Sequence, residues 1–162
     1  MKTIHKITAI SILTALYVVL SSFPKINFIG NIQLDLGYLA FTVGLCAFGI
    51  WGAIVGVVGC ALESILFSAY GFSISWVVAN TIIGIGCGLV FMKTNKIWMQ
   101  AAAVVVFCGI GLLFAKTIIE CNLYNIPFAV KIPKNAVAFG VDTFVMLLGF
   151  GIFKRVKKAI KK

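Results

Sequence analysis

The chain has 162 residues, of which 62% are hydrophobic and only 11% are charged, and its formal net charge is +10. Soluble domains carry about 25% charged residues, so this composition excludes both a soluble enzyme and a disordered chain. A membrane span needs roughly 20 apolar residues, so six spans would use about 120 residues and leave no room for a soluble domain. We therefore expect residues 1–162 to form one all-α integral membrane domain.

Six apolar runs are predicted to be the membrane-spanning helices of this bundle. In chain order they cover roughly residues 6–23, 34–48, 51–67, 73–92, 98–124 and 133–153. The first run lacks a clear small-x-small cleavage pattern, so it is interpreted as a retained helix that ends at Pro24. Gly49 and Trp51 indicate a tight turn between the second and third runs. Asn125 to Pro127 breaks the fifth run, and Pro133 is expected to open the last helix.

The cations lie mostly at the ends of the apolar runs and predict the orientation of the chain. If the N-terminus is cytoplasmic, ten of the fourteen Lys and Arg residues fall in inside segments, including the basic tail that begins at Lys154. The positive-inside rule then predicts that both termini are cytoplasmic, in a bacterial-type plasma membrane. The basic tail also suits an anionic inner leaflet. The high net charge therefore indicates topology, and no nucleic-acid partner is expected.

All four acidic residues lie within or beside apolar runs, where a charge costs several kcal/mol unless it is paired or faces water. Asp35 falls at the outer start of the second span, where it also fits a helix N-cap. Glu63 and Glu120 fall near the outer ends of the third and fifth spans. Asp142 lies two turns into the sixth span, where it is expected to have a function or to form a buried pair.

The other polar groups are concentrated in the same outer half. Lys116 and Glu120 are four residues apart, so they share a helix face and can form an ion pair, either structural or ligand-contacting. Trp76 and Asn80 have the same spacing in the outer half of the fourth span. Aromatic residues such as Tyr38 lie at this level as well, either as an interfacial belt or as part of a site. An ion path would need polar groups throughout the membrane, so this asymmetry favours an outward-facing binding site.

Motifs for catalysis or for a bound metal are missing from the sequence. It has no Walker A loop, no HExxH, no nucleophile near a histidine and no paired-Asp metal motif. The five cysteines form no CxxC, so they are expected to be small buried residues. We therefore expect no enzymatic activity, no cofactor and no metal site.

Small residues recur at helical spacing in three of the runs. They occur at Ser11 and Ala15, at Gly52 and Gly56, and at Gly84, Gly86 and Gly88. Small residues let helices approach closely in lipid, which predicts internal packing in general. For Ser11 and Ala15 a contact with another protein is also an open interpretation.

Four segments carry a resemblance to a known family. Residues 7–21 are similar to its opening helix, and the segment from Asp35 to Ala40 followed by residues 48–56 is similar to its glycine-rich turn. Gly71, Phe72, Gly84 and Gly88 resemble the fourth-helix region of its folate branch, and Pro133 to Asn135 resembles the start of its last helix. On these segments the chain resembles the substrate-binding S component of energy-coupling factor (ECF) transporters, nearest to the folate and riboflavin-type branches.

This resemblance implies a function and a set of partners. An S component captures a vitamin or similar micronutrient at the outer face with high affinity, and then associates with a membrane scaffold subunit and two ATPase subunits. The resemblance implies that Ser11 and Ala15 dock on the scaffold and that the segment from Pro24 to Leu34 forms a lid. It implies a substrate-binding set comprising Trp76, Asn80, Lys134, Asn135, Glu63, Tyr38, Lys116 and Glu120. Of these, Trp76 would supply a stacking face, Asn80 an amide and Lys134 a cation.

The substrate class follows from where the sequence departs from the folate branch. That branch often carries a proline after the Gly-Phe pair and an arginine near the last helix, whereas this chain has Ser73 and Lys131. Aromatic groups with few charges favour a flat, largely neutral ring, such as a flavin, a pterin, or a pyridoxine-like or deazapurine compound.

Two other functions stay open on the sequence. A standalone secondary carrier or channel would need coupling-ion ligands and usually an internal repeat, and only Asp142 favours it. A non-transport membrane scaffold protein would instead pair its outer polar residues with one another in a sealed network without a cavity.

Overall fold

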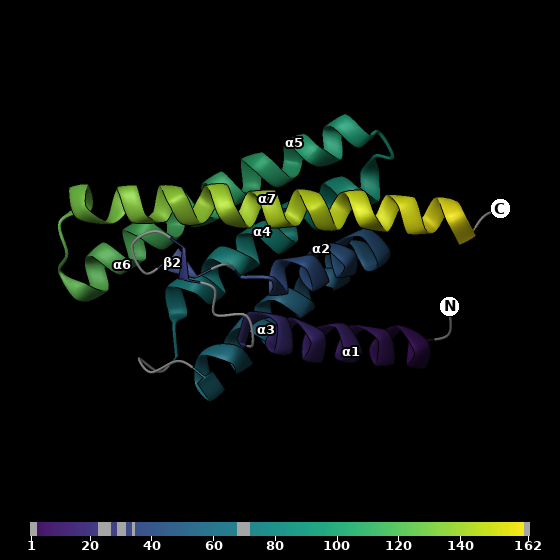
Figure 1. Cartoon of the computed structure of the whole chain (residues 1–162), viewed down its shortest axis with the longest axis horizontal. Coiled ribbons are helices and arrows are strands. Elements are labelled where there is room, and N and C mark those ends of the chain that lie inside the picture. The colour runs from purple at the N-terminus through teal and green to yellow at the C-terminus, as the bar shows by residue number, and fades with distance from the viewer. Residues whose placement is uncertain (1–2, 23–26, 29–31, 34, 68–71, 161–162) are drawn as a thin grey trace.

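The structure, a computed structural model, describes residues 3–22, 27–28, 32–33, 35–67 and 72–160 and is helical apart from two short strands (Figure 1). The helices are α1 (Thr3–Ser22), α2 (Gly37–Phe48), α3 (Ala53–Phe67), α4 (Ile74–Lys93), α5 (Ile97–Cys108), α6 (Thr117–Tyr124) and α7 (Phe128–Ile160). The 3-10 helix η1 (Gly49–Gly52) joins α2 to α3, and the π-helix η2 (Gly109–Lys116) joins α5 to α6. The strands β1 (Asn27–Phe28) and β2 (Ile32–Gln33) pair in antiparallel fashion. The rest of the predicted lid, residues 24–26, 29–31 and 34, lies outside the described residues.

The expected membrane character is confirmed by the helices. Five described helical stretches are long and apolar enough to cross a bilayer, namely Thr3–Ser22, Gly37–Phe67, Ile74–Lys93, Ile97–Tyr124 and Phe128–Lys154. Large apolar side chains cover their outward faces, as at Ile65, Met92, Trp98, Phe114 and Phe144. The chain is therefore a multi-pass membrane protein with an all-helical bundle, while the count of six spans stays a prediction.

The difference between five stretches and six predicted spans lies in the stretch Gly37–Phe67, which folds back on itself. Gly49 has a φ of 59°, a left-handed conformation that glycine adopts without strain. A Cβ atom at Gly52 would overlap the backbone of Gly44, and one at Gly56 would lie 2.6 Å from the ring of Phe41. Helices α2 and α3 therefore form an antiparallel hairpin, and the tight turn expected at Gly49 is confirmed. With 12 and 15 residues, each arm is shorter than a typical span.

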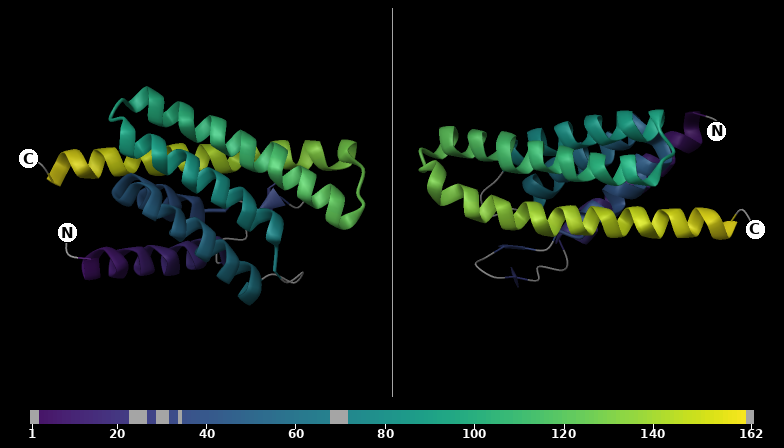
Figure 2. Two further views of the ribbon diagram at one scale, coloured as in Figure 1. Left: turned by 180° about the vertical axis from the view of Figure 1, so that it is seen from behind. Right: turned by 90° about the horizontal axis from the view of Figure 1, so that it is seen from above.

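The hairpin and the other long helices bring both described ends of the chain to the same end of the bundle (Figures 1 and 2). Helix α4 packs against α3, α5 and η2, while α1 packs against both arms of the hairpin and α7 against α2. The core between them contains fully buried large side chains, including Tyr17, Tyr38, Phe41, Leu45, Ile83, Leu112 and Met146. We refer below to the end that holds the termini and to the opposite end.

The start of the last helix differs from the sequence-based expectation. Helix α7 begins at Phe128, so Pro133 lies inside it instead of opening it. Proline lacks an N–H group, so Pro133 removes one hydrogen bond, which the helix tolerates here in its second turn. The true break is the expected one at Asn125, whose φ of 50° is left-handed and ends α6. The earlier start adds Lys131 to the helix.

Candidate functional site

Asp35 is the centre of a first group of polar side chains at the opposite end. Its Oδ1 accepts hydrogen bonds from Ser21 Oγ at 2.6 Å and from the backbone N–H of Gly37 at 2.8 Å. Its Oδ2 accepts a longer bond of 3.4 Å from the hydroxyl of Tyr17. Asp35 thus satisfies the first N–H of α2, although the N-cap residue itself is Leu36. Burial raises the pKa of the Asp35 carboxyl above its ordinary value of 3.8, and the three hydrogen bonds oppose that rise.

The same group continues inward through two residues that the sequence singled out. The hydroxyl of Tyr38 donates to Asn80 Oδ1 at 2.8 Å, and Asn80 Nδ2 donates to the hydroxyl of Tyr17 at 3.4 Å. The hydrogen bonds therefore form a chain in which Tyr38 donates to Asn80, Asn80 to Tyr17 and Tyr17 to Asp35. We call this group the Asp35 network, and its members are Tyr17, Ser21, Asp35, Tyr38 and Asn80. It ties together α1, α4 and the start of α2.

A second group of polar residues is built around Lys116 at the same end. The Lys116 ammonium donates to Asn135 Oδ1 at 3.1 Å and lies 3.9 Å from Glu120 Oε1, so the predicted pairing of Lys116 with Glu120 is confirmed. It also lies 3.5 Å from the centre of the Trp76 ring, in a cation–π contact. Lys116 is only 4% exposed. Its charge is therefore stabilised by a carboxylate, an amide oxygen and an indole face together.

Glu120 and Asn135 connect this group to two further helices. Glu120 pairs with Lys131 at 3.1 Å and accepts a hydrogen bond from Ser75 at 3.3 Å. Asn135 Nδ2 donates to Thr117 Oγ1 at 2.8 Å and to Glu120 Oε2 at 3.5 Å. We call this group the Lys116 network, and its members are Ser75, Trp76, Lys116, Thr117, Glu120, Lys131 and Asn135. It joins α4, the η2–α6 segment and α7.

The π-helix η2 determines which side chains face this network. Its wider turns shift the register of the helix, and Thr117 Oγ1 correspondingly donates to the carbonyl of Leu112, five residues earlier, at 3.4 Å. As a result Lys116 and its neighbour Thr117 are both buried and both contact Asn135. Such π-turns occur frequently at functional sites.

Asp142 lies on α7 and forms part of neither network. It is 2% exposed, and its Oδ2 is buried without a hydrogen-bond partner among the described residues. It is nevertheless close enough to interact electrostatically with Lys116 of one network and with Asp35 of the other. Asp142 therefore occupies the region between the two networks.

The structure brings together six of the eight residues predicted to bind substrate, in two groups. Trp76, Lys116, Glu120 and Asn135 belong to the Lys116 network, whereas Tyr38 and Asn80 belong to the Asp35 network. Lys134 is exposed on α7, and Glu63 is half-buried on α3 outside both networks as defined. Ser11 and Ala15, predicted to dock on a scaffold, are both exposed on α1.

Sequence reasoning missed five members of the networks. Tyr17 and Ser21 have the same four-residue spacing that drew attention to Trp76 and Asn80, so this spacing was a usable signal for them. Lys131 was assigned to a loop because Pro133 was expected to open the helix. Nothing in the local sequence marks Ser75 and Thr117, since their partners come from other helices.

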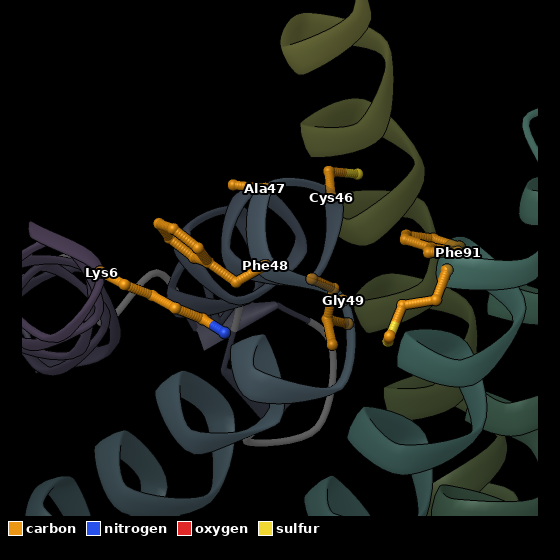
Figure 3. Close-up of a pocket in the computed structure, with 8 residues that line it drawn as sticks. Lys6, Cys46, Ala47, Phe48, Gly49 and Phe91 are labelled. Atoms are coloured by element: carbon orange, nitrogen blue, oxygen red, sulfur yellow. The ribbon is translucent and has the colours of Figure 1, made fainter. Parts of the chain in front are cut away.

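A hollow of about 480 Å³ lies at the end that holds the termini (Figure 3). Its lining comes from the start of α1, the last turns of α2 and α4 and the first residue of η1, and comprises Lys6, Leu45, Cys46, Ala47, Phe48, Gly49, Phe91 and Met92. Figure 3 shows the Lys6 side chain extending from α1 toward Phe48. None of the predicted substrate-binding residues lines this hollow. Within the described residues, no group of His, Cys, Asp and Glu side chains is placed to hold a metal ion.

A family model and a solved structure both match this chain over most of its length. The family model described as "ECF-type riboflavin transporter, S component" matches residues 1–153. The fold is similar to a crystal structure of the S component for biotin from an ECF-type ABC transporter, with a TM-score of 0.69 and 18% sequence identity. That match covers 97% of this chain and 93% of the other. At this identity the second match supports the fold alone.

Proposed function

The chain belongs to the family of ECF-type riboflavin transporter S components, and from this premise we propose that it binds riboflavin at the end of the bundle opposite the termini. The family is one of vitamin-type substrate-binding subunits and not of enzymes. The substrate, its place on the chain and the ATP-hydrolysing partners are the proposed steps beyond that membership.

The Lys116 network is the observation that carries this proposal. It combines an indole face, an ammonium group and a carboxamide from α4, η2 and α7 in one largely buried cluster. A flat ring system needs these groups, because an aromatic face stacks on it and polar groups fix its edges. In the proposed complex the ring of riboflavin replaces the Lys116 ammonium over Trp76, and Lys116 turns to a carbonyl oxygen of the ligand.

The proposed topology has six spans, with the α2–α3 hairpin supplying two of them and both termini in the cytoplasm. The networks then face the outside of a bacterial-type plasma membrane, where riboflavin is captured. A membrane scaffold subunit and two ATPase subunits complete the transporter. Ser11 and Ala15 are exposed and four residues apart on α1, which supports a helix contact with the scaffold at that face.

Riboflavin binding to the purified protein tests the assignment of the ligand. Protein from riboflavin-depleted cells is titrated with riboflavin, whose fluorescence is quenched when the ring stacks on an aromatic side chain. We expect Trp76→Leu to weaken binding about tenfold, because stacking on an aromatic side chain contributes about 1–3 kcal/mol. Trp98→Leu is the matched control, because Trp98 is 87% exposed at the start of α5. Wild-type protein that leaves riboflavin fluorescence unchanged would contradict the proposal.

Co-purification with the scaffold and ATPase subunits tests the proposed partners separately. Ser11→Trp and Ala15→Trp place a bulky ring on the exposed face of α1 and should weaken co-purification without changing riboflavin binding. Leu16→Trp, on the same helix at a position 44% exposed, is the control for a general effect of the added ring. Equal recovery of the partners with all three variants would remove the docking role of Ser11 and Ala15.

One observation favours a second candidate, a membrane scaffold protein without a ligand. Lys116, Glu120 and Asn135 bind one another, as expected for a sealed network. The same titration separates the two functions, since a sealed network binds no riboflavin and Trp76→Leu then changes only stability.

A further inference from the structure

Asp142 lies on the same face of α7 as Asn135 of the Lys116 network. The two residues are seven positions apart, which in an α-helix returns to nearly the same direction about 10 Å farther along the axis. Ala138 lies between them on this face and is also buried. Ala138 projects only a methyl group between the two polar side chains.

One oxygen of the Asp142 carboxyl lacks the hydrogen-bond partner that a buried polar atom normally has. Its Oδ2 accepts no hydrogen bond from the described residues, although Asp142 is only 2% exposed. Leaving a buried acceptor unsatisfied costs about 1–3 kcal/mol, and more when the group is charged. The polar atoms of the Asp35 network, by contrast, are used within that network. No described side chain supplies a donor to Oδ2 of Asp142.

The position of Asp142 indicates where that donor would enter. It interacts electrostatically with Lys116 on one side, and with Asp35 and Tyr38 on the other. A ligand that stacks on Trp76 and reaches inward between the two networks would bring its far edge toward Asp142. The hydrogen-bond donor to Asp142 would then be a group on the innermost edge of the ligand ring.

We propose that Oδ2 of Asp142 accepts a hydrogen bond from a ring N–H of the ligand, which in riboflavin is the imide N3–H between two carbonyl groups. This proposal rests on the proposed function, and it adds the group that selects the ligand. In its ionised form the Asp142 carboxyl has no proton to donate, so it favours a ring with an N–H and disfavours a ring that presents only acceptors. A site built around one such bond discriminates strongly against an analogue that lacks the donor.

Two probes and three variants test this bond. The probes are riboflavin and 3-methylriboflavin, in which a methyl group replaces the N3 proton. The variants are Asp142→Asn, Asp142→Ala and, as a control on the same helix, Thr143→Val, whose side chain is buried beside Asp142. Affinity is measured by quenching of flavin fluorescence, and stability by thermal unfolding of each variant without ligand.

We expect wild-type protein to bind riboflavin at least about 100-fold more tightly than 3-methylriboflavin. Asp142→Asn should weaken riboflavin binding about 10- to 100-fold, because hydrogen bonds to charged groups contribute about 1.5–3 kcal/mol. In Asp142→Ala the preference for riboflavin over its methyl derivative should fall below about tenfold, since the acceptor is gone and space is created. Thr143→Val should keep the wild-type preference.

The ligand-free melting temperature separates a ligand contact from a structural role. If the partner of Asp142 is the ligand, Asp142→Asn should melt no lower than the wild type when riboflavin is absent. A clear loss of ligand-free stability would show a partner within the protein and overturn the proposal. Unchanged riboflavin binding by Asp142→Asn would overturn it as well, while the proposed function stands. Wild-type protein that binds no riboflavin would overturn both.

Discussion

The two polar networks lie at the same end of one bundle, yet they are built differently. The Asp35 network holds one carboxylate, and neutral donors from three helices lead to it in a single direction. The Lys116 network holds three charged groups and an indole face, and next to it lies the Asp142 carboxyl, whose Oδ2 has no hydrogen-bond partner among the described residues. The first network is complete without a ligand, whereas the second adjoins a group that is not.

This difference separates a structural role from a binding role. Donors and acceptors that match one another across helices fix the arrangement of those helices, and they gain nothing from a further ligand. A charged side chain that has several partners can give up one of these partners and contact a ligand instead, because the remaining partners still stabilise its charge. We therefore expect changes in the Asp35 network to act mainly on stability, and changes around Lys116 to act on stability and riboflavin binding together.

Replacing Glu120 should have the largest effect and would show how much the Lys116 network depends on one carboxylate. Glu120→Ala removes the shared partner of Lys116 and Lys131 and leaves the buried Lys116 without its ion pair. We expect the free energy of unfolding to fall by about 3 kcal/mol and riboflavin binding to be lost. Denaturant unfolding and fluorescence titration measure the two effects. Glu120→Gln keeps the acceptor oxygen and should retain part of the stability, so equal losses in both variants would contradict the ion-pair explanation.

Replacing Asp35 should have an intermediate effect, confined to stability. Asp35→Ala leaves Ser21, Tyr17 and the N–H of Gly37 without their acceptor, so we expect a loss of about 2 kcal/mol. Riboflavin affinity, measured well below the melting temperature, should change less than about threefold. A larger loss of affinity than in Trp76→Leu would abolish the distinction between the networks.

The pH dependence of stability gives a second test at Asp35. Its pKa is raised in the folded protein, so the folded state holds the proton more tightly than the unfolded state does. The stabilisation from that proton is complete below the ordinary value of 3.8 and is lost as the pH rises through the raised pKa. The melting temperature of the wild type should therefore fall as the pH rises through this interval, relative to that of Asp35→Asn. Parallel pH profiles for the two proteins would contradict this assignment.

The smallest effects should come from two lysines that are three residues apart on α7. Lys131→Ala removes the 3.1 Å pair with Glu120 from a partly exposed site and should cost about 1 kcal/mol. Lys134→Ala changes an exposed side chain and should cost less than about 0.5 kcal/mol. If Lys134 contacts the substrate as predicted from the sequence, Lys134→Ala should instead lose riboflavin affinity clearly. Denaturant unfolding and riboflavin titration of both variants decide between a small loss of stability and a loss of affinity.

The sequence predicted most of the membrane architecture because that architecture depends on local pattern. Apolar runs, Gly49 and Asn125 marked the helices and turns within a few residues of their observed ends. The start of α7 was wrong because proline is tolerated in an early turn, and local pattern does not distinguish opening a helix from lying inside it. The six-span count and the direction of the termini are still predictions.

The candidate site was predictable where its residues share one helix. The pairing of Lys116 with Glu120 follows from their spacing alone. The pairing of Tyr38 with Asn80, or of Lys116 with Asn135, depends on which helices pack together, and no local pattern encodes that choice. The unpartnered oxygen of Asp142 is likewise a property of the assembled bundle.

The π-helix η2 has a consequence for how binding preferences can change over evolution. A π-turn is a helix that has absorbed extra residues, so the chain there can lose one residue and remain helical. Because the wider turns hold the extra residues locally, a single deletion between Gly109 and Phe114 would restore regular α-helical turns there and leave the rest of the bundle in place. It would change mainly which side chains of this short segment face the neighbouring helices next to Lys116. A length change at this position is therefore a local way to alter the site.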